Sequence, residues 1–478
     1  MLAALDEITA LLGEDNVSTD RENLISHSGS DFQSYPFSRA TAKTSVFIAY
    51  PETTEHVSQI ARICHRRRIP ITPYSGGTSI EGATMPTCGG ICIDFQRMTS
   101  VQVNAADLDC VVQPGVGWED LNERLETQGL FFPPDPGPGA MIGGMIGTGC
   151  SGTNAASYGT MKDWVLSLTV VLADGTVVRT RQRPRKSSAG YDLTRLYVGS
   201  EGTLGLVTEA TLKLAVKPAH QIVAVSTFKT IRDAASAVQN ILAAGIQFTA
   251  IEILDDVQMR SINEAQLTKL RWDEAPTLFF RFASDSQEGA LHHSQAAQAI
   301  AARHRSTSYT LAVSKDEQAE LWSARKAALW SMMALRQAPT DRVWTTDVAV
   351  PLSRLPEIIE WTKREISSSE IVGSIVGHVA DGNFHALLLF DEEKRFVAEK
   401  IVHRMVEKAL SLEGTATGEH GVGLVKRDYL HKELGQPTVD LMRKVKHSDH
   451  TRTLKNNDMD DVDTADNRSR LRWTLSVC

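Results

Sequence analysis

The sequence has no long apolar run, few cysteines and no excess of positive charge. None of its stretches reaches the roughly 18 consecutive apolar residues that a membrane-spanning helix needs, so we expect no membrane span. Six cysteines in 478 residues are too few for a disulfide framework and favour a reducing compartment. A formal charge of -8 and a pI of about 6.0 argue against nucleic acid as a partner.

The first residues also lack the pattern of a targeting segment. Residues 1–20 (MLAALDEITALLGEDNVSTD) carry several acidic side chains and do not begin with a basic region. A secretory signal starts with positive charge, and a transit peptide is rich in arginine. We therefore see no import signal in this stretch.

Glycine, in contrast, is concentrated in three clusters. They are PYSGGTSIEG (73–82), PGPGAMIGGMIGTGCSGTNAASYGTM (136–161) and GYDLTRLYVGSEGTLGLVTEA (190–210). Glycine lets the backbone approach a ligand closely, and successive N–H groups form nests that hold phosphates. No G-x-G-x-x-G opens a helix after a strand, so this is not the usual dinucleotide-binding fingerprint. Glycines of ordinary loops are the alternative, but three clusters with interleaved Ser and Thr favour a diphosphate ligand.

The two halves of the chain have different patterns. The first half alternates short β-branched runs with amphipathic stretches, such as the helical periodicity of residues 55–68. After about residue 217, strands are interleaved with long helices, which predicts an α+β domain with helices on one face of an antiparallel sheet. We therefore expect one domain in residues 1–217, with its core in about 42–217, and a second in residues 218–446.

One stretch predicts a hairpin with two histidines that face each other. In GHVADGNFHALLLF (377–390), apolar runs flank Asp381-Gly382, which is a strong hairpin signal. With these two residues as the loop, His378 lies opposite His385, and their β-carbons are about 5 Å apart. A lone histidine is more often structural, but an opposed pair suits a divalent metal such as Zn²⁺, or Mn²⁺ with added oxygen ligands.

A third ligand is available in TGEHGVG (417–423), where Glu419 and His420 are flanked by glycines. Glycine on both sides lets the backbone come close to a metal or a substrate. This stretch therefore becomes the candidate partner of the two histidines.

A cation for an anionic substrate is offered by LWSARKAALW (321–330). Arg325 and Lys326 lie there on an otherwise apolar amphipathic helix. The alternative is that both side chains reach into solvent from the helix surface. Trp322, one turn earlier, is expected in the core.

Together these motifs resemble a known family. SGGTSIEG, IGG followed by SGTN and YG, GSEGTLGLVTEATL, GHVADGNFH and GTATGEHGVGLVKRDYL occur in the order found in FAD-linked oxidases of the vanillyl-alcohol oxidase type. The resemblance covers roughly residues 20–446, and TTDVAVP (345–351), which we read mainly as a core strand, matches the D-lactate branch. It implies a two-part FAD-binding domain followed by an α+β cap domain with an antiparallel sheet. FAD is expected to bind noncovalently, because no histidine or cysteine stands at an obvious attachment point.

The resemblance also implies which residues contact FAD. In the family, the FAD diphosphate lies on the loop that matches Ser75–Ser79, and three later segments complete the site. The expected FAD-binding residues are Ser75, Gly76, Gly77, Thr78, Ser79, Gly143, Gly144, Thr148, Ser151, Gly152, Tyr158, Glu201, Gly202 and Val207.

The same resemblance assigns the chemistry of the second half. In the family, the hairpin histidines and the glutamate bind a divalent metal, and the next histidine is the base. This implies His378, His385 and Glu419 as ligands of Zn²⁺ or Mn²⁺, and His420 as the base. It also implies Arg325 as the clamp of the substrate carboxylate, a role that suits the planar fork of arginine.

The resemblance implies an FAD-dependent oxidoreductase that oxidises a small D-2-hydroxy acid, with D-lactate to pyruvate as the expected reaction. Hydride passes to the flavin, and cytochrome c or a similar one-electron acceptor then takes the electrons. Glycolate or D-2-hydroxyglutarate as substrate, or an inactive paralogue, are the alternatives. The family suggests a mitochondrial location, and the cytoplasm is the alternative because residues 1–20 show no import signal.

The C-terminal residues depart from the family pattern. The match holds up to about Lys446 (LMRKVK), after which family members continue with a Leu-Asp-Pro…Asn-Pro-Gly segment. Residues 447–478 are instead polar and rich in Asp and Arg, and they lack apolar periodicity, so we expect disorder there. This aberrant tail is the reason for the inactive alternative.

Overall fold

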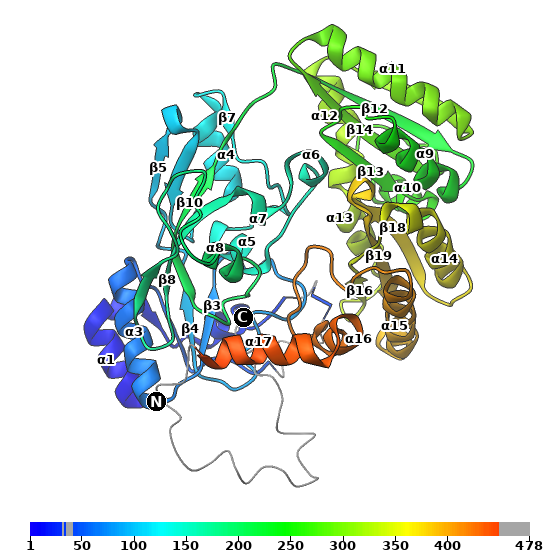
Figure 1. The fold of residues 1–478 in the computed structure, drawn as a ribbon. Helices are drawn as coiled ribbons and strands as arrows, with labels where there is room; N and C mark the ends of the chain where they lie inside the picture. Colours follow the sequence, from blue (N-terminus) through cyan, green and yellow to red (C-terminus); the bar gives the residue numbers. More distant parts are fainter. Residues whose placement is uncertain (31–32, 35–41, 449–478) are drawn as a thin grey trace.

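The computed structural model describes residues 1–30, 33–34 and 42–448 (Figure 1). The chain forms two lobes, one built around strands β1–β11 and the other around β12–β19. The last helix, α17 (Gln436–Ser448), crosses below both lobes in this view. The disorder expected for the C-terminal tail concerns residues that lie outside the described part of the chain, apart from the last two residues of α17.

The first lobe contains two main sheets. A four-stranded sheet has the order β1-β2-β4-β3, with β2, β4 and β3 parallel and β1 antiparallel. A five-stranded antiparallel sheet has the order β5-β6-β10-β8-β9, and β7 and β11 form a separate pair. The strands are β1 (Val17–Ser18), β2 (Phe47–Ala49), β3 (Ile71–Tyr74), β4 (Ile91–Asp94), β5 (Val101–Asn104), β6 (Asp109–Val112), β7 (Leu130–Phe131), β8 (Val165–Val171), β9 (Val177–Arg179), β10 (Leu206–Lys213) and β11 (Ala215–Val216).

The helices of this lobe surround the two sheets. They are α1 (Leu2–Leu12), η1 (Glu14–Asn16), α2 (Arg21–Ser26), α3 (Thr54–Arg67), η2 (Ala105–Asp107), α4 (Trp118–Glu126), α5 (Ile142–Thr148), α6 (Ala155–Tyr158), α7 (Met161–Trp164) and α8 (Leu193–Tyr197). Helix α3 confirms the helix predicted over 55–68: the Thr53 side chain caps it by accepting a hydrogen bond from the His56 amide. Its apolar face packs against α1 and the strands, so the helix covers the four-stranded sheet.

The second lobe is built on one antiparallel sheet with the order β15-β12-β14-β13-β18-β19-β16, and β17 pairs with β19. Its strands are β12 (His220–Phe228), β13 (Ala250–Leu254), β14 (Thr277–Ser284), β15 (Ser306–Ala312), β16 (Arg342–Thr345), β17 (Val348–Ala349), β18 (Val372–Gly377) and β19 (Asn383–Phe390). Its helices, together with those after the sheet, are α9 (Ile231–Ala243), α10 (Asp256–Ala265), α11 (Gln287–Arg303), α12 (Lys315–Lys326), α13 (Ala328–Ala334), η3 (Leu352–Arg354), α14 (Leu355–Ser367), η4 (Val379–Asp381), η5 (Glu392–Lys394), α15 (Arg395–Ser411), η6 (Arg427–Tyr429) and α16 (Leu430–Leu434).

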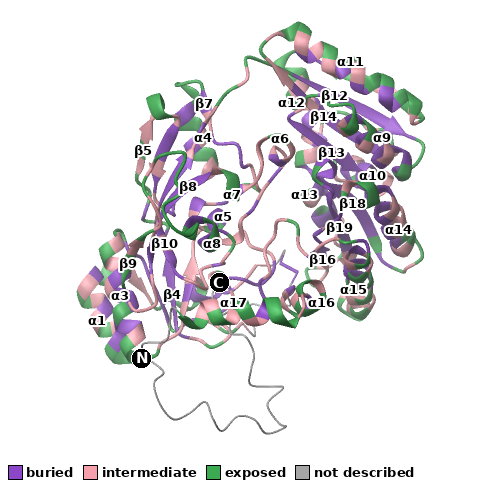
Figure 2. Cartoon of the chain, in the orientation of Figure 1, coloured by how far each residue is buried: buried purple, intermediate pink, exposed green. Residues whose placement is uncertain are grey.

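Helices cover both faces of this sheet, which corrects the expectation of helices on one face. Helices α9, α11, α14 and α15 pack on one face, and α10, α12 and α13 pack on the other (Figure 2). The strands allow this because neighbouring residues, such as Phe279 and Phe280 of β14, are both fully buried on opposite faces. The sheet face covered by α12 and α13 also includes Glu252, Arg281 and His385. Each of them is two positions from a core residue on that face, namely Leu254, Phe279 and Leu387, and side chains two apart in a strand point to the same side.

The histidine hairpin forms, but its register differs from the predicted one. Val376, and not His378, pairs with His385. The turn is longer than two residues because residues 379–381 form the 3₁₀ turn η4, and Gly382 adopts a φ of 74°. A shift of two residues keeps each side chain on its face of the sheet, so both imidazoles still face the same space. Their ring centroids are 5.7 Å apart.

Contacts outside the main sheets join the two lobes. The Ser34 hydroxyl donates a hydrogen bond to the Thr345 carbonyl oxygen over 3.1 Å. At the other end of the chain, Lys446 of α17 donates to the Thr203 carbonyl oxygen of the first lobe. Within the described residues, no helix combines the length and apolar character needed to cross a bilayer.

Candidate active site

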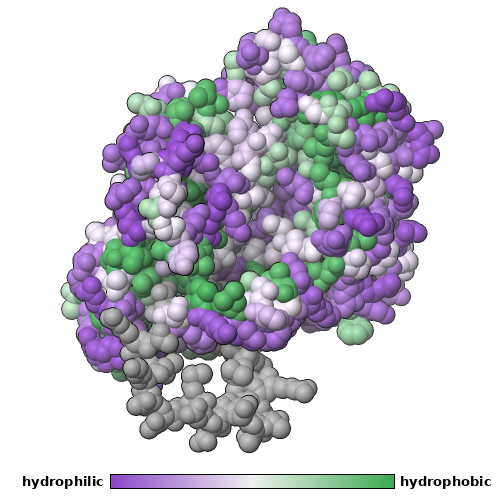
Figure 3. Space-filling view, viewed as in Figure 1, coloured by the Kyte–Doolittle hydropathy of each residue, from purple (hydrophilic) through white to green (hydrophobic). Residues whose placement is uncertain are grey.

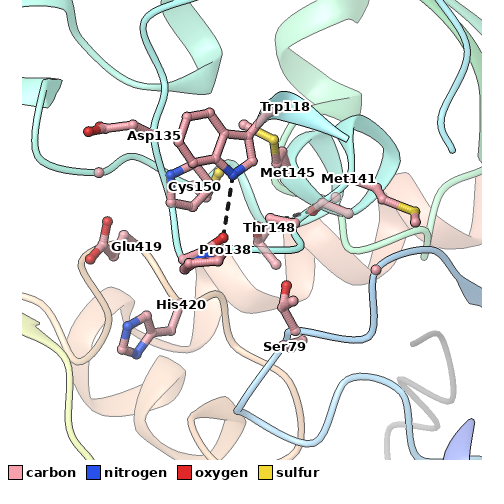
Figure 4. Close-up of a pocket in the computed structure, with 18 of the residues that line it drawn as sticks. Ser79, Trp118, Asp135, Pro138, Met141, Met145, Thr148, Cys150, Glu419 and His420 are labelled. Atoms are coloured by element: carbon pink, nitrogen blue, oxygen red, sulfur yellow. Dashed lines mark hydrogen bonds between the residues drawn. The ribbon is translucent and has the colours of Figure 1, made fainter. Parts of the chain in front are cut away.

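A cavity of about 840 Å³ lies between the lobes. One wall comes from the three glycine clusters of the first lobe, and the other comes from the cap sheet, α12 and the loop 417–423. The space-filling view shows the surface hollowed between the two lobes (Figure 3). In the close-up, Glu419 and His420 lie on one side of this space, and Trp118, Met145 and Thr148 lie on another (Figure 4).

The glycine-rich wall fits a large planar cofactor with a diphosphate. A β-carbon at Gly76 would lie 2.4 Å from the Gly139 carbonyl oxygen, so only glycine lets these two loops pack together. Gly144 faces open space at the cavity wall, where a side chain would occupy room needed by a ligand. The wall thus combines close loop packing with bare backbone, as a bound dinucleotide requires.

Most of the expected FAD-binding residues line this cavity. They are Ser75, Gly76, Gly77, Thr78, Ser79, Gly143, Gly144, Thr148, Gly152, Glu201, Gly202 and Val207. Ser151 does not line it, and its hydroxyl donates a hydrogen bond to Glu419 Oε2 over 2.5 Å. Tyr158 also lies off the wall, where its ring packs against Phe131 and Trp164.

The expected metal ligands converge on one point of the cavity. Glu419 Oε1 lies 3.0 Å from His378 Nε2 and 3.2 Å from His385 Nε2. All three side chains are largely shielded from solvent. Two imidazole nitrogens and one carboxylate oxygen are a donor set that suits Zn²⁺ or Mn²⁺. The residues present therefore fit a divalent cation.

The far nitrogens of both imidazoles are held by acceptors. His378 Nδ1 lies 2.7 Å from Glu252 Oε1, and His385 Nδ1 lies 2.8 Å from the Thr346 carbonyl oxygen. A carbonyl oxygen can only accept, so Nδ1 of His385 carries a proton, and Nε2 is the ring nitrogen that faces Glu419. Such partners fix the tautomer and orientation of histidines that bind metals. Both rings thus present Nε2 to the cavity.

Without a cation, the acids of the site pair with its histidines. Burial alone would lower the pKa of His378, but Glu252 and Glu419 outweigh burial and hold it well above its usual value. Burial likewise opposes ionisation of Glu419, but the facing His378 and His385 hold the pKa of this carboxyl well below its usual value. The cluster therefore keeps Glu419 ionised, which is the form that binds a cation.

Asp347 anchors the loop that carries Glu419 and His420. Asp347, His385 and His420 also lie close enough to form a second possible ligand group. However, the Asp347 carboxylate is already saturated with hydrogen bonds. Its donors are the amides of Gly418, Glu419 and His420, the Thr417 hydroxyl and the Asn383 amide nitrogen. Asp347 therefore positions the backbone of the loop, and Glu419 is the carboxylate left for a metal.

His420 lies beside the ligand cluster and lines the cavity. Its ring stacks on that of His385, with centroids 4.8 Å apart and an interplanar angle of 11°. Burial would lower the pKa of His420, but the charge of Asp347 and the nearby Glu81 raise it above its usual value. The imidazole is thus placed between the expected metal site and the cavity, as a base for a bound hydroxyl would be.

Arg325 lines the same cavity from α12. Its Nε atom lies 2.7 Å from Glu252 Oε2. Glu252 belongs to the cap sheet, where it is fully buried and also contacts His378. Trp322 is buried in the core as expected, and it also forms part of the cavity wall. A second arginine, Arg281 of β14, lines the cavity with its guanidinium 4.1 Å from the Trp322 ring centroid.

Sequence reasoning missed four charged residues of this site. They are Glu252, Arg281, Asp347 and Asp135. Each lies in an apolar or proline-rich stretch, where the charge itself is the signal that the residue belongs to a site. Asp347 was inside TTDVAVP, which we read mainly as a core strand. Burial raises the pKa of Asp135 to about 6, although the Thr153 hydroxyl and the Asn154 amide bind it. Glu252 and Arg281 thus lie within strands, whereas Asp135 and Asp347 lie in loops.

Two family models match the chain. "FAD binding domain" matches residues 46–181, and "FAD linked oxidases, C-terminal domain" matches residues 217–448. A solved 4-ethylphenol oxidase from Gulosibacter chungangensis has the same fold, with a TM-score of 0.76 at 16% identity over 94% of each chain. The expected fold class, a two-part FAD-binding domain followed by an α+β cap, is confirmed.

The chain belongs to the FAD-linked oxidase family. It is 47% identical over 452 residues to the mitochondrial D-lactate dehydrogenase [cytochrome] of Kluyveromyces lactis, covering 93% of this chain and 78% of the relative. It is 44% identical over 464 residues to D-lactate dehydrogenase [cytochrome] 1, mitochondrial, of Saccharomyces cerevisiae, covering 95% and 79%. The expected membership in the D-lactate branch of the family is thus confirmed.

Proposed function

We propose that this protein oxidises D-lactate to pyruvate with FAD as the hydride acceptor. The proposal is based on one observation: residues suited to a flavin and residues suited to a metal and a base line the same cavity. Glycine loops fit a flavin dinucleotide, and His378, His385, Glu419 and His420 face the same space. The similarity to D-lactate dehydrogenases supports D-lactate as the substrate.

Arg325 binds the substrate carboxylate in this proposal. Its Nε atom is held by Glu252, which leaves the two terminal nitrogens of the guanidinium for the ligand. A side chain fixed at one end loses less freedom when it binds, so the ion pair preorganises the clamp. The carboxylate is thereby held beside His378, because Glu252 contacts both residues.

His420 removes the proton from the C2 hydroxyl. It lines the cavity next to the expected ligands, and the stacked ring of His385 limits its rotation. A base placed in this way contributes roughly 10²- to 10⁴-fold to a rate. The neighbouring acids Asp347 and Glu419 favour the positive charge that His420 gains.

His378, His385 and Glu419 hold a divalent cation, Zn²⁺ or Mn²⁺, in this proposal. Such a cation, when bound, supplies Lewis acidity that lowers the pKa of a substrate hydroxyl. FAD, bound noncovalently on the glycine loops, would supply the acceptor for the C2 hydride. The protein contributes orientation: the carboxylate clamp, the ligands and the base all come from the cap lobe and face the glycine wall.

The deciding experiment is an anaerobic absorbance spectrum of the purified protein before and after D-lactate and then L-lactate are added. We expect a flavin band that D-lactate bleaches and L-lactate does not. A flavin band untouched by D-lactate would overturn the substrate. A colourless protein would instead support the inactive alternative that the divergent tail suggested.

A dicarboxylate such as D-2-hydroxyglutarate is a second candidate substrate, because a second arginine lines the cavity. Arg281 projects from the same sheet face as Glu252. Bleaching rates with D-lactate, glycolate and D-2-hydroxyglutarate discriminate the candidates. An Arg281→Leu variant should lose the dicarboxylate reaction selectively if this arginine binds a second carboxylate.

Three further proposals follow from the same family membership. Cytochrome c or a similar one-electron acceptor reoxidises the flavin, which reduced-cytochrome absorbance would report. The protein acts in mitochondria, as the names of both relatives state for those proteins. The boundary between the FAD-binding and cap domains falls at residues 217–218, between β11 and β12.

A further inference from the structure

Glu81 is a buried acid directly behind the expected base. It follows the glycine loop 75–79 and has no exposed surface. Its backbone oxygen accepts a hydrogen bond from the Leu424 amide over 2.8 Å. A β-carbon at Gly423 would lie 2.2 Å from the same oxygen, so the loop 417–423, which contains His420, packs directly against the Glu81 backbone. The flavin-binding lobe thus reaches the catalytic loop of the cap through this residue.

The carboxylate of Glu81 lacks a hydrogen-bond donor among the described residues. Both of its oxygens are buried without a partner, and so is His420 Nδ1. Glu81 Oε1 lies 3.6 Å from this nitrogen and 3.9 Å from Lys426 Nζ. Buried polar groups rarely stay unpaired, because leaving one unsatisfied costs about 1–3 kcal/mol. An unpaired acceptor and an unpaired ring nitrogen that face each other are therefore natural partners.

The other acid near His420 cannot take this role. Asp347 Oδ2 lies 4.0 Å from His420 Nδ1, but it already accepts the amides of residues 418–420 and the Thr417 hydroxyl. Lys426 is also engaged, since Nζ donates to the carbonyl oxygens of Ala416 and Asp347 over 2.7 and 3.2 Å. Glu419 is engaged as well, by His378, His385 and the Ser151 hydroxyl, so among the described residues Glu81 is the remaining carboxylate near the ring nitrogen.

We propose that Glu81 is a positioning residue that holds His420 as the Nδ1–H tautomer and orients its Nε2 toward the substrate hydroxyl. The inference rests on the proposed role of His420 as the base. The proton on Nδ1 points to Glu81, so the lone pair on Nε2 is free to accept the hydroxyl proton. The stacked His385 ring fixes the plane of the imidazole, and Glu81 fixes its direction within that plane.

The alternative is that Glu81 only balances the charge of buried Lys426. The two roles differ in the distance that they demand. An aspartate at position 81 keeps the negative charge near Lys426 but withdraws the oxygens from His420 by about one bond length along the chain. The Glu81→Asp variant therefore still balances the charge of Lys426, but it no longer orients the His420 imidazole.

The test is stopped-flow flavin reduction by D-lactate, without oxygen, in the FAD-loaded Glu81→Gln and Glu81→Asp variants. We expect both to lower the limiting rate about 10- to 100-fold, which is part of the roughly 10²- to 10⁴-fold effect of a general base. FAD content and the D-lactate concentration for half-maximal rate should stay at the wild-type level. A wild-type rate in Glu81→Asp would overturn the proposal in favour of charge balance.

A double-mutant cycle separates positioning from damage to the loop. In a His420→Ala background, Glu81→Gln should change the rate less than twofold, because a positioning residue acts through the residue that it positions. An additive loss would overturn the proposal.

The tautomer gives a readout that does not depend on the proposed substrate. The ¹⁵N spectrum of histidine-labelled enzyme at about pH 9, where a free imidazole is neutral, should show His420 protonated at Nδ1 in the wild type. The signal is assigned by its loss in His420→Ala. A mixture of tautomers should appear in Glu81→Gln. An Nε2–H wild type would overturn the inference even if D-lactate reduces the flavin. The expected signal would support it even if D-lactate is not the substrate.

Discussion

Glu252 links the expected carboxylate clamp to an expected metal ligand. Its Oε2 atom lies 2.7 Å from Arg325 Nε, and its Oε1 atom lies 2.7 Å from His378 Nδ1. One fully buried carboxylate thus sets the orientation of a side chain expected to bind the substrate and of another expected to bind the metal. Removing one member of a buried charged network leaves the others unpaired, which costs more than the loss of a surface ion pair.

Glu252→Gln should therefore weaken metal binding and substrate binding together. The amide holds His378 less strongly, and loss of such partners typically costs about 10- to 100-fold in metal affinity. The amide also releases Arg325, so the KM for D-lactate should rise. Metal content after dialysis and the KM measure the two effects. Glu320→Gln, on the same helix as Arg325 but outside the cavity wall, is the matched control.

Arg325→Lys should raise the KM for D-lactate with a smaller effect on kcat. Lysine keeps the charge but cannot offer two parallel N–H groups to a carboxylate. The lost interaction is a charge-assisted hydrogen bond worth about 1.5–3 kcal/mol, so the KM should rise roughly tenfold or more. Steady-state kinetics over a range of D-lactate concentrations give both constants. An unchanged KM would remove Arg325 as the clamp.

The hairpin shows what local sequence can predict and what it cannot. The Asp381-Gly382 signal correctly predicted two strands that bring His378 and His385 to one place. The turn, however, packs against a residue outside the hairpin: a β-carbon at Gly382 would lie 2.2 Å from the Val350 carbonyl oxygen. Such a close approach is not visible in a hairpin read by itself.

Chelation should inactivate the enzyme reversibly. His378, His385 and Glu419 converge with both Nδ1 atoms already bound, so the two Nε2 atoms and the Glu419 carboxylate meet at one point, where a cation would bind all three. EDTA treatment followed by dialysis should abolish flavin reduction by D-lactate while FAD stays bound. Added Zn²⁺ or Mn²⁺ should restore it, and Mg²⁺ serves as the control ion. Full activity in protein shown to be metal-free would mean that the histidine pair has another purpose.

His420→Ala should abolish rapid flavin reduction and leave FAD in place. The residue lines the cavity, and its backbone is held by Asp347, so removal of the imidazole should not release the loop. We expect a loss of roughly 10²- to 10⁴-fold in the limiting rate. Anaerobic stopped-flow absorbance measures the rate and the flavin content in one experiment. A rate close to wild type would exclude His420 as the base.

The candidate site was predictable where a motif carried its own chemistry. His378, His385, Glu419 and His420 stand in short glycine-flanked stretches, and the structure brings all four together. Glu81 and Glu252 could not be assigned in the same way, because each acts on a residue more than a hundred positions away. Glu81 reaches His420 through the packing of the two lobes, and Glu252 reaches His378 through the pairing of β13 with β18. Periodicity and spacing report neither.

The buried Glu201 gives the protein a pH dependence of stability. Burial raises the pKa of Glu201 to about 7 from its usual 4.5, although the Gly423 and Val422 amides donate to it. The folded state therefore holds this proton more tightly than the unfolded state does. Its contribution is fully present below pH 4.5 and is lost as the pH rises through about 7.

Glu201→Gln isolates this effect, because glutamine accepts the same amides and does not titrate. Between pH 5 and pH 8, the free energy of unfolding of the wild type should fall by roughly 2–3 kcal/mol relative to the variant. Urea unfolding of the FAD-loaded proteins at the two pH values measures the difference. Glu209→Gln, which removes a half-buried carboxylate from the neighbouring strand β10, should follow the wild-type curve. Parallel curves for wild type and Glu201→Gln would show that Glu201 holds its loop as an ordinary ionised carboxylate.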